Sequence, residues 1–135
     1  CIDTKKDIQE LIGDICGKSH ERFRNELIRA QESHIKLIIL TEVDGGYCDR
    51  KRTIYNKPVT CIKDLFSWKN PRLFIFQGGK QNCPKATKGQ TLAKCLLTLE
   101  AKYGCEFRFV TSENSGEEIL RLLGQGEQQN FAEDV

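Results

Sequence analysis

Apolar residues recur along the chain at helical spacing in three separate stretches. Positions three and four apart predict amphipathic helices over residues 7–16, 19–32 and 88–103. Asp7 is placed to cap the first of these helices, with a glutamate three residues later, and Gly104 is a suitable residue just past the end of the third. The pattern therefore predicts helices that each bury one face.

A fourth helix is indicated near the carboxyl end of the chain. Ser115 and Glu118 form a capping-box pattern ahead of an apolar stretch, and the helix is expected to end near Gly124. Residues 125–135 are polar and rich in Gly, Gln and Glu, which is typical of a mobile tail. We expect one domain over residues 1–124, followed by that tail.

Three shorter stretches have the pattern of strands. Ile35 to Thr41 is short, rich in β-branched residues and nearly continuously apolar, which favours a central strand covered on both faces. Residues 1–6 predict a strand that leads directly into the first helix, and Glu106 to Val110 alternates as a half-buried strand does. This order predicts an α/β fold in which the strands share one layer between helices.

Length and composition fit a domain with a sizeable core. The chain has 135 residues, of which 39% are hydrophobic and 30% charged, and no apolar run approaches the roughly 18 residues of a membrane span. No signal peptide is visible, so we expect a cytoplasmic protein with no membrane contact. The net charge is only +2, so a nucleic-acid-binding face requires local clustering of basic residues.

Seven cysteines are spread along the chain, an odd number with neither a C-x-x-C pair nor zinc-finger spacing. We expect them to be buried free thiols in a reducing cytosol. Cys48, Cys61 and Cys83 share one loop-rich region, so a zinc clip there is an open alternative.

Asp3 and Lys5 form the candidate chemistry of the first strand. Residues two apart on a strand project from the same face, so this carboxylate and this ammonium are expected to lie together. A D-x-K pair at a strand end recurs in proteins that cut phosphodiesters. There the carboxylate holds a hard divalent cation, and the lysine orients a water and steadies the phosphate charge. The alternative is a surface ion pair, because the pattern also arises often by chance.

Two further groups of charged residues are candidate phosphate contacts. Arg22 and Glu26 share one face of the second helix, which is also the pattern of a solvated row of ion pairs. Arg50-Lys51-Arg52 forms a basic cluster in a loop and is either solvated or in contact with phosphates. Phosphate contacts of this kind position a nucleic acid without reading its sequence.

The order of these features resembles the XPF-type nuclease domain, a branch of the PD-(D/E)XK, restriction-endonuclease-like superfamily, and most closely its small bacterial and phage members. The resemblance covers nearly the whole chain up to Gly124 and rests on the order and spacing of five stretches. These are Ile2-Asp3-Thr4-Lys5 with Glu10-Leu11, Arg22-Phe23-Arg24-Asn25-Glu26-Leu27, Ile35 to Glu42, Trp68-x-Asn70-Pro71-Arg72, and Ala86 to Leu92.

The resemblance implies a mixed sheet flanked by helices and a Mg²⁺- or Mn²⁺-dependent endonuclease that cuts branched or structured DNA in repair or recombination. Asp3 would bind the metal, Lys5 would act on the water and the phosphate, and Glu26 would supply a further oxygen. Basic side chains would contact phosphates, namely Arg22, Arg24, Arg50, Lys51 and Arg52. The expected location is the cytoplasm of a bacterium or of a phage-infected cell, and a homodimer is an open alternative to a monomer.

The chain departs from the family pattern in two places. Thr4 stands where the family has arginine, and nothing in the chain supplies the Gly-Asp motif of the strand pair that precedes D-x-K in the family. Because Asp3 and Lys5 are both intact, we expect a domain that lacks its first strands and not a dead one. The alternative function is a catalytically inactive, nuclease-like module that binds DNA or a protein partner.

Overall fold

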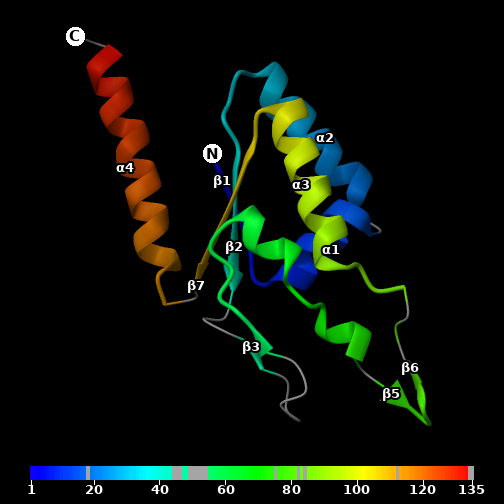
Figure 1. Ribbon diagram of the computed structural model, residues 1–135. Helices are drawn as coiled ribbons and strands as arrows, with labels where there is room; N and C mark the ends of the chain where they lie inside the picture. Colours follow the sequence, from blue (N-terminus) through cyan, green and yellow to red (C-terminus); the bar gives the residue numbers. More distant parts are fainter. Residues whose placement is uncertain are drawn as a thin grey trace.

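Three parallel strands form the main sheet of the protein (Figure 1). They are β1 (Ile2–Lys5), β2 (Ile38–Val43) and β7 (Glu106–Thr111), in the order β1-β2-β7, so the most apolar stretch lies in the centre as predicted. The resemblance implies a mixed sheet, whereas these three strands all run in one direction. The computed structural model describes residues 1–17, 19–43, 47–48, 55–74, 76–81, 83, 85–111 and 113–133.

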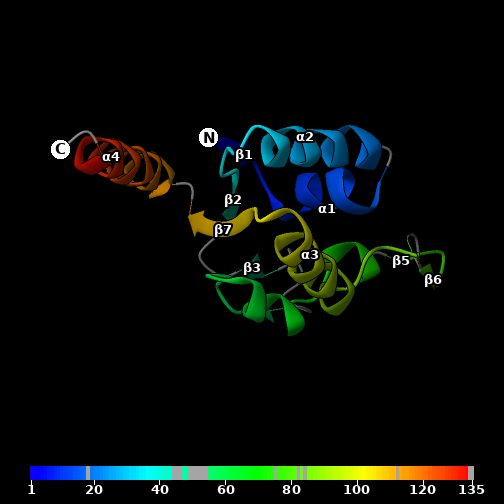
Figure 2. The same cartoon turned by 90° about the horizontal axis from the view of Figure 1, so that it is seen from above.

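Helices cover both faces of this sheet. α1 (Ile8–Cys16), α2 (His20–Glu32) and α3 (Gly89–Tyr103) lie on one face, and α4 (Ser115–Glu133) lies on the other (Figures 1 and 2). On the face opposite the main core, Leu40 of the central strand is fully buried and Ile38 and Glu42 are half-buried, so the apolar sequence predicts the burial of β2 in part. α4 continues well past Gly124, where the sequence predicts its end. Gly124 and Gly126 each cost the helix only about 1 kcal/mol, which does not by itself force a stop.

The described part of the connection between β2 and α3 holds short elements. Two of them form a hairpin whose tip is Gly78-Gly79, both with positive φ, and this hairpin projects away from the body of the protein in both views (Figures 1 and 2). The short elements are β3 (Tyr47–Cys48) paired with β4 (Tyr55–Asn56), the 3₁₀ helices η1 (Ile62–Phe66) and η2 (Pro71–Phe74), and β5 (Phe76–Gln77) paired with β6 (Lys80–Gln81).

Local sequence explains where two of the helices begin and end. The carboxylate of Asp7 accepts a hydrogen bond from the backbone N–H of Glu10 at 2.8 Å, so Asp7 caps α1 as predicted. Gly104 follows α3 with a φ of 69°, the left-handed conformation that glycine adopts without strain. Because Asp7 follows β1 by two residues, its cap also fixes the direction in which α1 leaves the strand.

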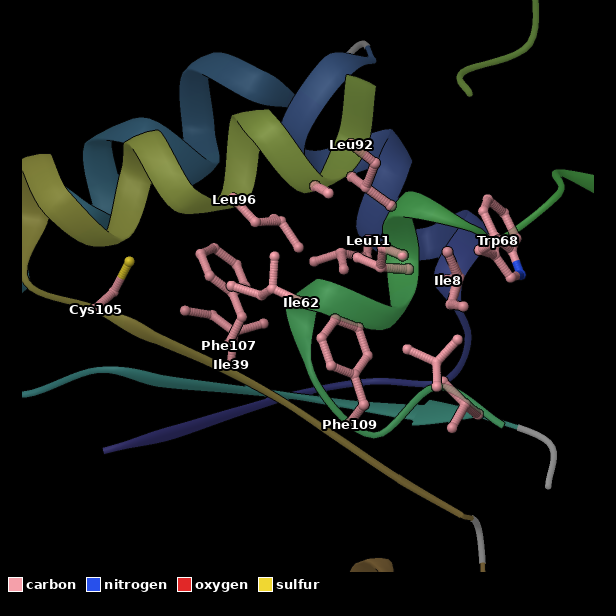
Figure 3. Packing of buried hydrophobic residues seen from close by; sticks show 14 of the residues in the cluster. Ile8, Leu11, Ile39, Ile62, Trp68, Leu92, Leu96, Cys105, Phe107 and Phe109 are labelled. Atoms are coloured by element: carbon pink, nitrogen blue, oxygen red, sulfur yellow. The ribbon is translucent and has the colours of Figure 1, made fainter. Parts of the chain in front are cut away.

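The main hydrophobic core lies between the sheet and helices α1, α2 and α3. Ile39, Phe107 and Phe109 project from the sheet toward Leu11 of α1 and Leu96 of α3 (Figure 3). All five are buried, and burying each such side chain contributes about 2 kcal/mol. This packing presses α1 onto the sheet beside the end of β1.

A close contact between α3 and η1 requires glycine at position 89. A Cβ atom there would lie 2.3 Å from the carbonyl oxygens of both Leu65 and Trp68. Backbone atoms cannot swing aside as the end of a flexible side chain can, so any larger residue would push α3 away from η1.

Gly89→Ala should therefore lower the free energy of unfolding by about 3 kcal/mol. Gly116→Ala is the matched control, because a Cβ at this helical glycine of α4 meets nothing within 4 Å. That control should leave stability unchanged or raise it by about 0.5 kcal/mol. Urea unfolding followed by circular dichroism compares the two variants. Equal effects of both substitutions would contradict the close contact.

Candidate active site

Lys5 is a buried lysine at the carboxyl end of β1. Its side chain is only 11% exposed, its ammonium lies 3.1 Å from Oδ2 of Asp3, and it forms a second ion pair with Asp14. Asp3 shares the strand face of Lys5, as the spacing predicts, and Asp14 comes from α1, which packs on that face. Strand and helix thus bring two carboxylates to one ammonium.

The buried face of α1 places Asp14 in this position. Ile8, Leu11 and Asp14 follow one another at intervals of three residues, and all three are buried. A carboxylate in such a row loses its contact with water and needs a cation, which Lys5 provides. The ring of Phe23 from α2 adds to the enclosure, with its centroid 5.6 Å from the ammonium.

A buried hydroxyl lies on the strand next to Lys5. Thr41 of β2 is the register partner of Lys5, and partners on neighbouring strands share one face of the sheet. The Oγ1 atom of Thr41 is buried without a hydrogen-bond partner in the described part of the chain. Because an unsatisfied buried hydroxyl costs about 1–3 kcal/mol, this end of the sheet retains polar groups at some expense of stability.

The cluster of Lys5, Asp3 and Asp14 carries one surplus negative charge, since two carboxylates surround one ammonium. Burial by itself would lower the pKa of Lys5, but its hydrogen bonds to Asp14 and Asp3 and their charges together outweigh burial. The pKa of Lys5 is therefore raised above its ordinary value of 10.5. Lys5 stays protonated at neutral pH and acts as a cation and hydrogen-bond donor, not as a base.

The second carboxylate beside Lys5 is Asp14, which the sequence does not single out. Glu26, the residue predicted there, is exposed on α2 and forms no ion pair with Lys5 in the described structure. A carboxylate in a helix usually faces water, so Asp14 is easily overlooked. The available signal is its spacing, because Asp14 lies three residues after Leu11 and falls on the apolar row of α1.

The basic residues predicted to contact phosphates are not part of this cluster. Arg22 and Arg24 are exposed on α2, where a nucleic acid can reach them. The loop cluster Arg50, Lys51 and Arg52 falls outside the residues that the structure describes.

The prediction that the cysteines are buried is wrong for three of them. Cys1, Cys16 and Cys61 are exposed; Cys16 is the last residue of α1, and Cys61 comes just before η1. Cys105 is buried as expected, and burial raises its pKa to about 11, which leaves this thiol unreactive at neutral pH. Among the described residues, no group of three or more His, Cys, Asp and Glu is placed to hold a metal, so none of them supports a zinc clip.

Comparison with known proteins adds no relative from which a site could be transferred. No protein-family model matches the chain, and neither the curated proteins nor the solved structures give a match. In the part of the chain that the structure describes, no helix is both long and apolar enough to cross a membrane.

The raised pKa of Lys5 predicts the pH range in which its ion pairs stabilise the fold. A raised folded-state pKa contributes stability that is complete below the unfolded value of about 10.5 and is lost as pH rises through the folded value. The stability difference between wild type and Lys5→Met should be constant from about pH 6 to about pH 9. It should fall above about pH 10.5, by at most about 1.4 kcal/mol per pH unit. Urea unfolding at a series of pH values measures it, and a difference that grows with alkaline pH would contradict the ion pairs.

Asp14→Asn should lower the free energy of unfolding by about 2 kcal/mol, because it leaves the buried ammonium with Asp3 as its remaining carboxylate partner. Glu32→Gln removes the same charge from the exposed end of α2 and should change stability by less than about 0.5 kcal/mol. Both values come from urea unfolding at neutral pH. An Asp14→Asn protein as stable as wild type would mean that the pair with Lys5 is not formed in solution.

Proposed function

We propose that this chain is the catalytic part of a metal-dependent endonuclease of the XPF type, with a restriction-endonuclease-like fold, which cuts branched or structured DNA. The observation that carries the proposal is the cluster of Lys5, Asp3 and Asp14 at the carboxyl end of an edge strand. In open α/β sheets, ligands bind beyond the carboxyl ends of the strands. A parallel sheet between layers of helices is the architecture on which such a site can be built.

Lys5 has the chemistry that phosphodiester cleavage needs. Negative charge builds on the non-bridging and leaving oxygens of the phosphate, and a preorganised ammonium in a site shielded from water stabilises that charge. Because its pKa is raised, Lys5 remains a cation and donates hydrogen bonds during the reaction. Asp3 is 32% exposed and Asp14 only 12%, so Asp3 is the carboxylate that an attacking water can reach.

Asp3 and Asp14 fit Mg²⁺ or Mn²⁺ as the cofactor. Mg²⁺ is commonly held by one or two carboxylates together with waters and substrate phosphates, and the surplus negative charge of the cluster favours a cation. Asp3, as the more exposed carboxylate, is the expected main ligand. When bound, such an ion would supply positive charge to the phosphate in addition to that of Lys5.

The outer edge of β1 suits the further acid that the resemblance implies. In the described sheet, β1 pairs with β2 and with no other strand. A strand on its outer edge would lie about 4.8 Å away, which would bring its side chains beside Asp3. The proposal therefore includes an additional carboxylate from a Gly-Asp strand.

A non-catalytic DNA- or partner-binding module is the second candidate, and one observation favours it. Asp3 and Asp14 satisfy Lys5 within the protein, as they would in an ion pair whose only role is to stabilise the fold. In the described residues these two carboxylates do not belong to any larger cluster suited to a metal. Metal-dependent cleavage separates the two candidates.

Nicking of a labelled branched duplex across a Mg²⁺ titration tests the proposal, in this chain and in the longest natural form of the protein. Asp3→Asn should abolish cutting and leave DNA binding intact, because it removes a ligand carboxylate and no phosphate contact. Lys5→Ala should slow cutting by about 100-fold or more without raising the Mg²⁺ concentration that cutting needs, because the loss of this ammonium frees Asp3 and Asp14 for a cation. The 135-residue chain alone should cut weakly, because a site with only two carboxylates binds Mg²⁺ weakly.

Glu32→Gln is again the matched control and should cut as wild type does, because this exposed carboxylate lies at the far end of α2. Cutting in excess EDTA, or undiminished cutting by Asp3→Asn, would place catalysis elsewhere. Binding of DNA without cutting at any Mg²⁺ or Mn²⁺ concentration, in the longest natural form as well, would favour the binding module.

A further inference from the structure

Charge is distributed very unevenly along the chain. Six of the 21 basic residues, and none of the 19 acidic residues, lie between Asp64 and Glu100. That segment therefore carries +6 while the rest of the chain carries −4, a separation that the overall net charge of +2 conceals. Where such a segment is exposed and folded together, its charge gives the protein a positive region beside an acidic remainder.

The six basic side chains of this segment are all exposed. None of them forms an ion pair within the described structure, in contrast to Lys36, Arg108 and Arg121, which each pair with a glutamate. Their charge is therefore open to an outside partner. They are Lys69, Arg72, Lys80, Lys85, Lys88 and Lys94.

The side chain of Asn70 links the segment at η2 to the loop that precedes α3, and these two segments carry several of the six basic side chains. Asn70 is 1% exposed, its amide donates to the carbonyl oxygen of Thr87 at 2.8 Å, and its Oδ1 accepts from the backbone N–H of Arg72 at 3.1 Å. One buried side chain thus holds η2 against the loop that precedes α3. As a result, the backbone that carries Arg72 lies close to the backbone that carries Lys88.

The β5–β6 hairpin is attached to the same unit. The side-chain amide of Gln81 donates a hydrogen bond to the carbonyl oxygen of Leu73, which ties β6 to η2. The hairpin carries Lys80 and extends away from the sheet and its helices (Figures 1 and 2). Residues 69–74, 76–81, 83 and 85–88 are called the 69–88 basic surface below.

This surface is connected to the candidate active site. The side-chain amide of Gln9 donates to Oδ1 of Asn70 at 2.8 Å. Gln9 lies in the first turn of α1, four residues after Lys5. The hydrogen bond therefore fixes the 69–88 basic surface beside the carboxyl end of β1.

We propose that the 69–88 basic surface binds the phosphate backbone of DNA and leads it to the Lys5 cluster, with the β5–β6 hairpin as an arm that extends the contact. That the bound DNA is also the substrate of the Lys5 cluster rests on the proposed function. The binding itself does not, because it can be measured without cleavage.

The chemistry of the surface favours a nucleic acid over a lipid membrane. Besides the basic residues it exposes Gln77 and Gln81, whose amides suit phosphates and sugars. Among its described side chains, Phe74 is the one large apolar residue that is exposed, whereas a membrane-binding surface needs a broad apolar face. Lys88 also stands at the amino end of α3, where the helix dipole disfavours a cation unless an anion is bound.

The test is equilibrium binding of a fluorescently labelled duplex DNA to the 135-residue chain in EDTA, where cutting cannot occur, at a series of salt concentrations. Lys80→Ala/Lys85→Ala should lower the slope of log affinity against log salt by about 2 and weaken binding at least about ten-fold at 0.1 M salt. Lys80→Arg/Lys85→Arg, which keeps both charges, should bind as wild type does. Circular dichroism melting verifies that all variants are folded.

Arg29→Ala/Lys102→Ala is the matched control. It removes two exposed basic side chains that form no ion pair in the described structure, from the last turns of α2 and α3. Lys102 is separated from Lys88 by most of α3, or about 20 Å. This control should keep both the affinity and the salt dependence of wild type.

Three outcomes would overturn the proposal. They are a loss of binding in the control double variant equal to that in Lys80→Ala/Lys85→Ala, unchanged binding in Lys80→Ala/Lys85→Ala, and preference for phosphatidylserine vesicles or polyglutamate over DNA. Failure of the proposed function is a separate result. If the chain binds DNA through this surface but the Asp3→Asn protein still cuts, the binding surface stands and the assignment of the catalytic centre falls.

Discussion

The ammonium of Lys5 is the constraint around which the carboxyl end of the sheet is organised. A lysine that is 11% exposed loses most of its hydration, and it stays charged only where carboxylates replace the lost water. Asp3 can do so because it shares the strand face, and Asp14 can do so only if α1 packs against β1 in one orientation. The pair therefore selects the angle at which the first helix leaves the first strand, and the apolar packing of Leu11 holds that angle.

The same interaction limits what the cluster can do chemically. Asp3 and Asp14 cannot direct all of their negative charge to Lys5 and also to a cation, so the proposed binding of a metal would depend on the single surplus negative charge. The unequal exposure of the two carboxylates divides their roles. Asp14, the more buried, is suited to keep Lys5 in place, whereas Asp3 can turn toward solvent and a ligand at little cost. A stable ion pair is thus compatible with the proposed catalytic role of the same cluster.

Sequence predicts the parts of this protein that depend on periodicity and on local backbone chemistry. The caps at Asp7 and Gly104, the helices between them and the central strand follow from such rules, because each involves residues close together in the chain. The burial of Asp14 could be predicted only from its partner in the fold, because a buried carboxylate needs a cation such as Lys5 beside it. The 69–88 basic surface can be found in the sequence only by counting charge segment by segment, because the net charge of the whole chain conceals it.

The charges of the two features constrain how a nucleic acid could be handled. The 69–88 basic surface carries five exposed positive charges and attracts phosphates over about 10 Å at 0.1 M salt. The Lys5 cluster, which Gln9 and Asn70 hold next to it, carries a surplus negative charge and repels a phosphate. If DNA binds as proposed, that binding would need no cation, whereas entry of a phosphate to Lys5 would require the surplus charge to be neutralised. DNA would then be held first and cut only after the cluster has gained positive charge, so the proposed binding energy and the proposed metal requirement would be set by different residues.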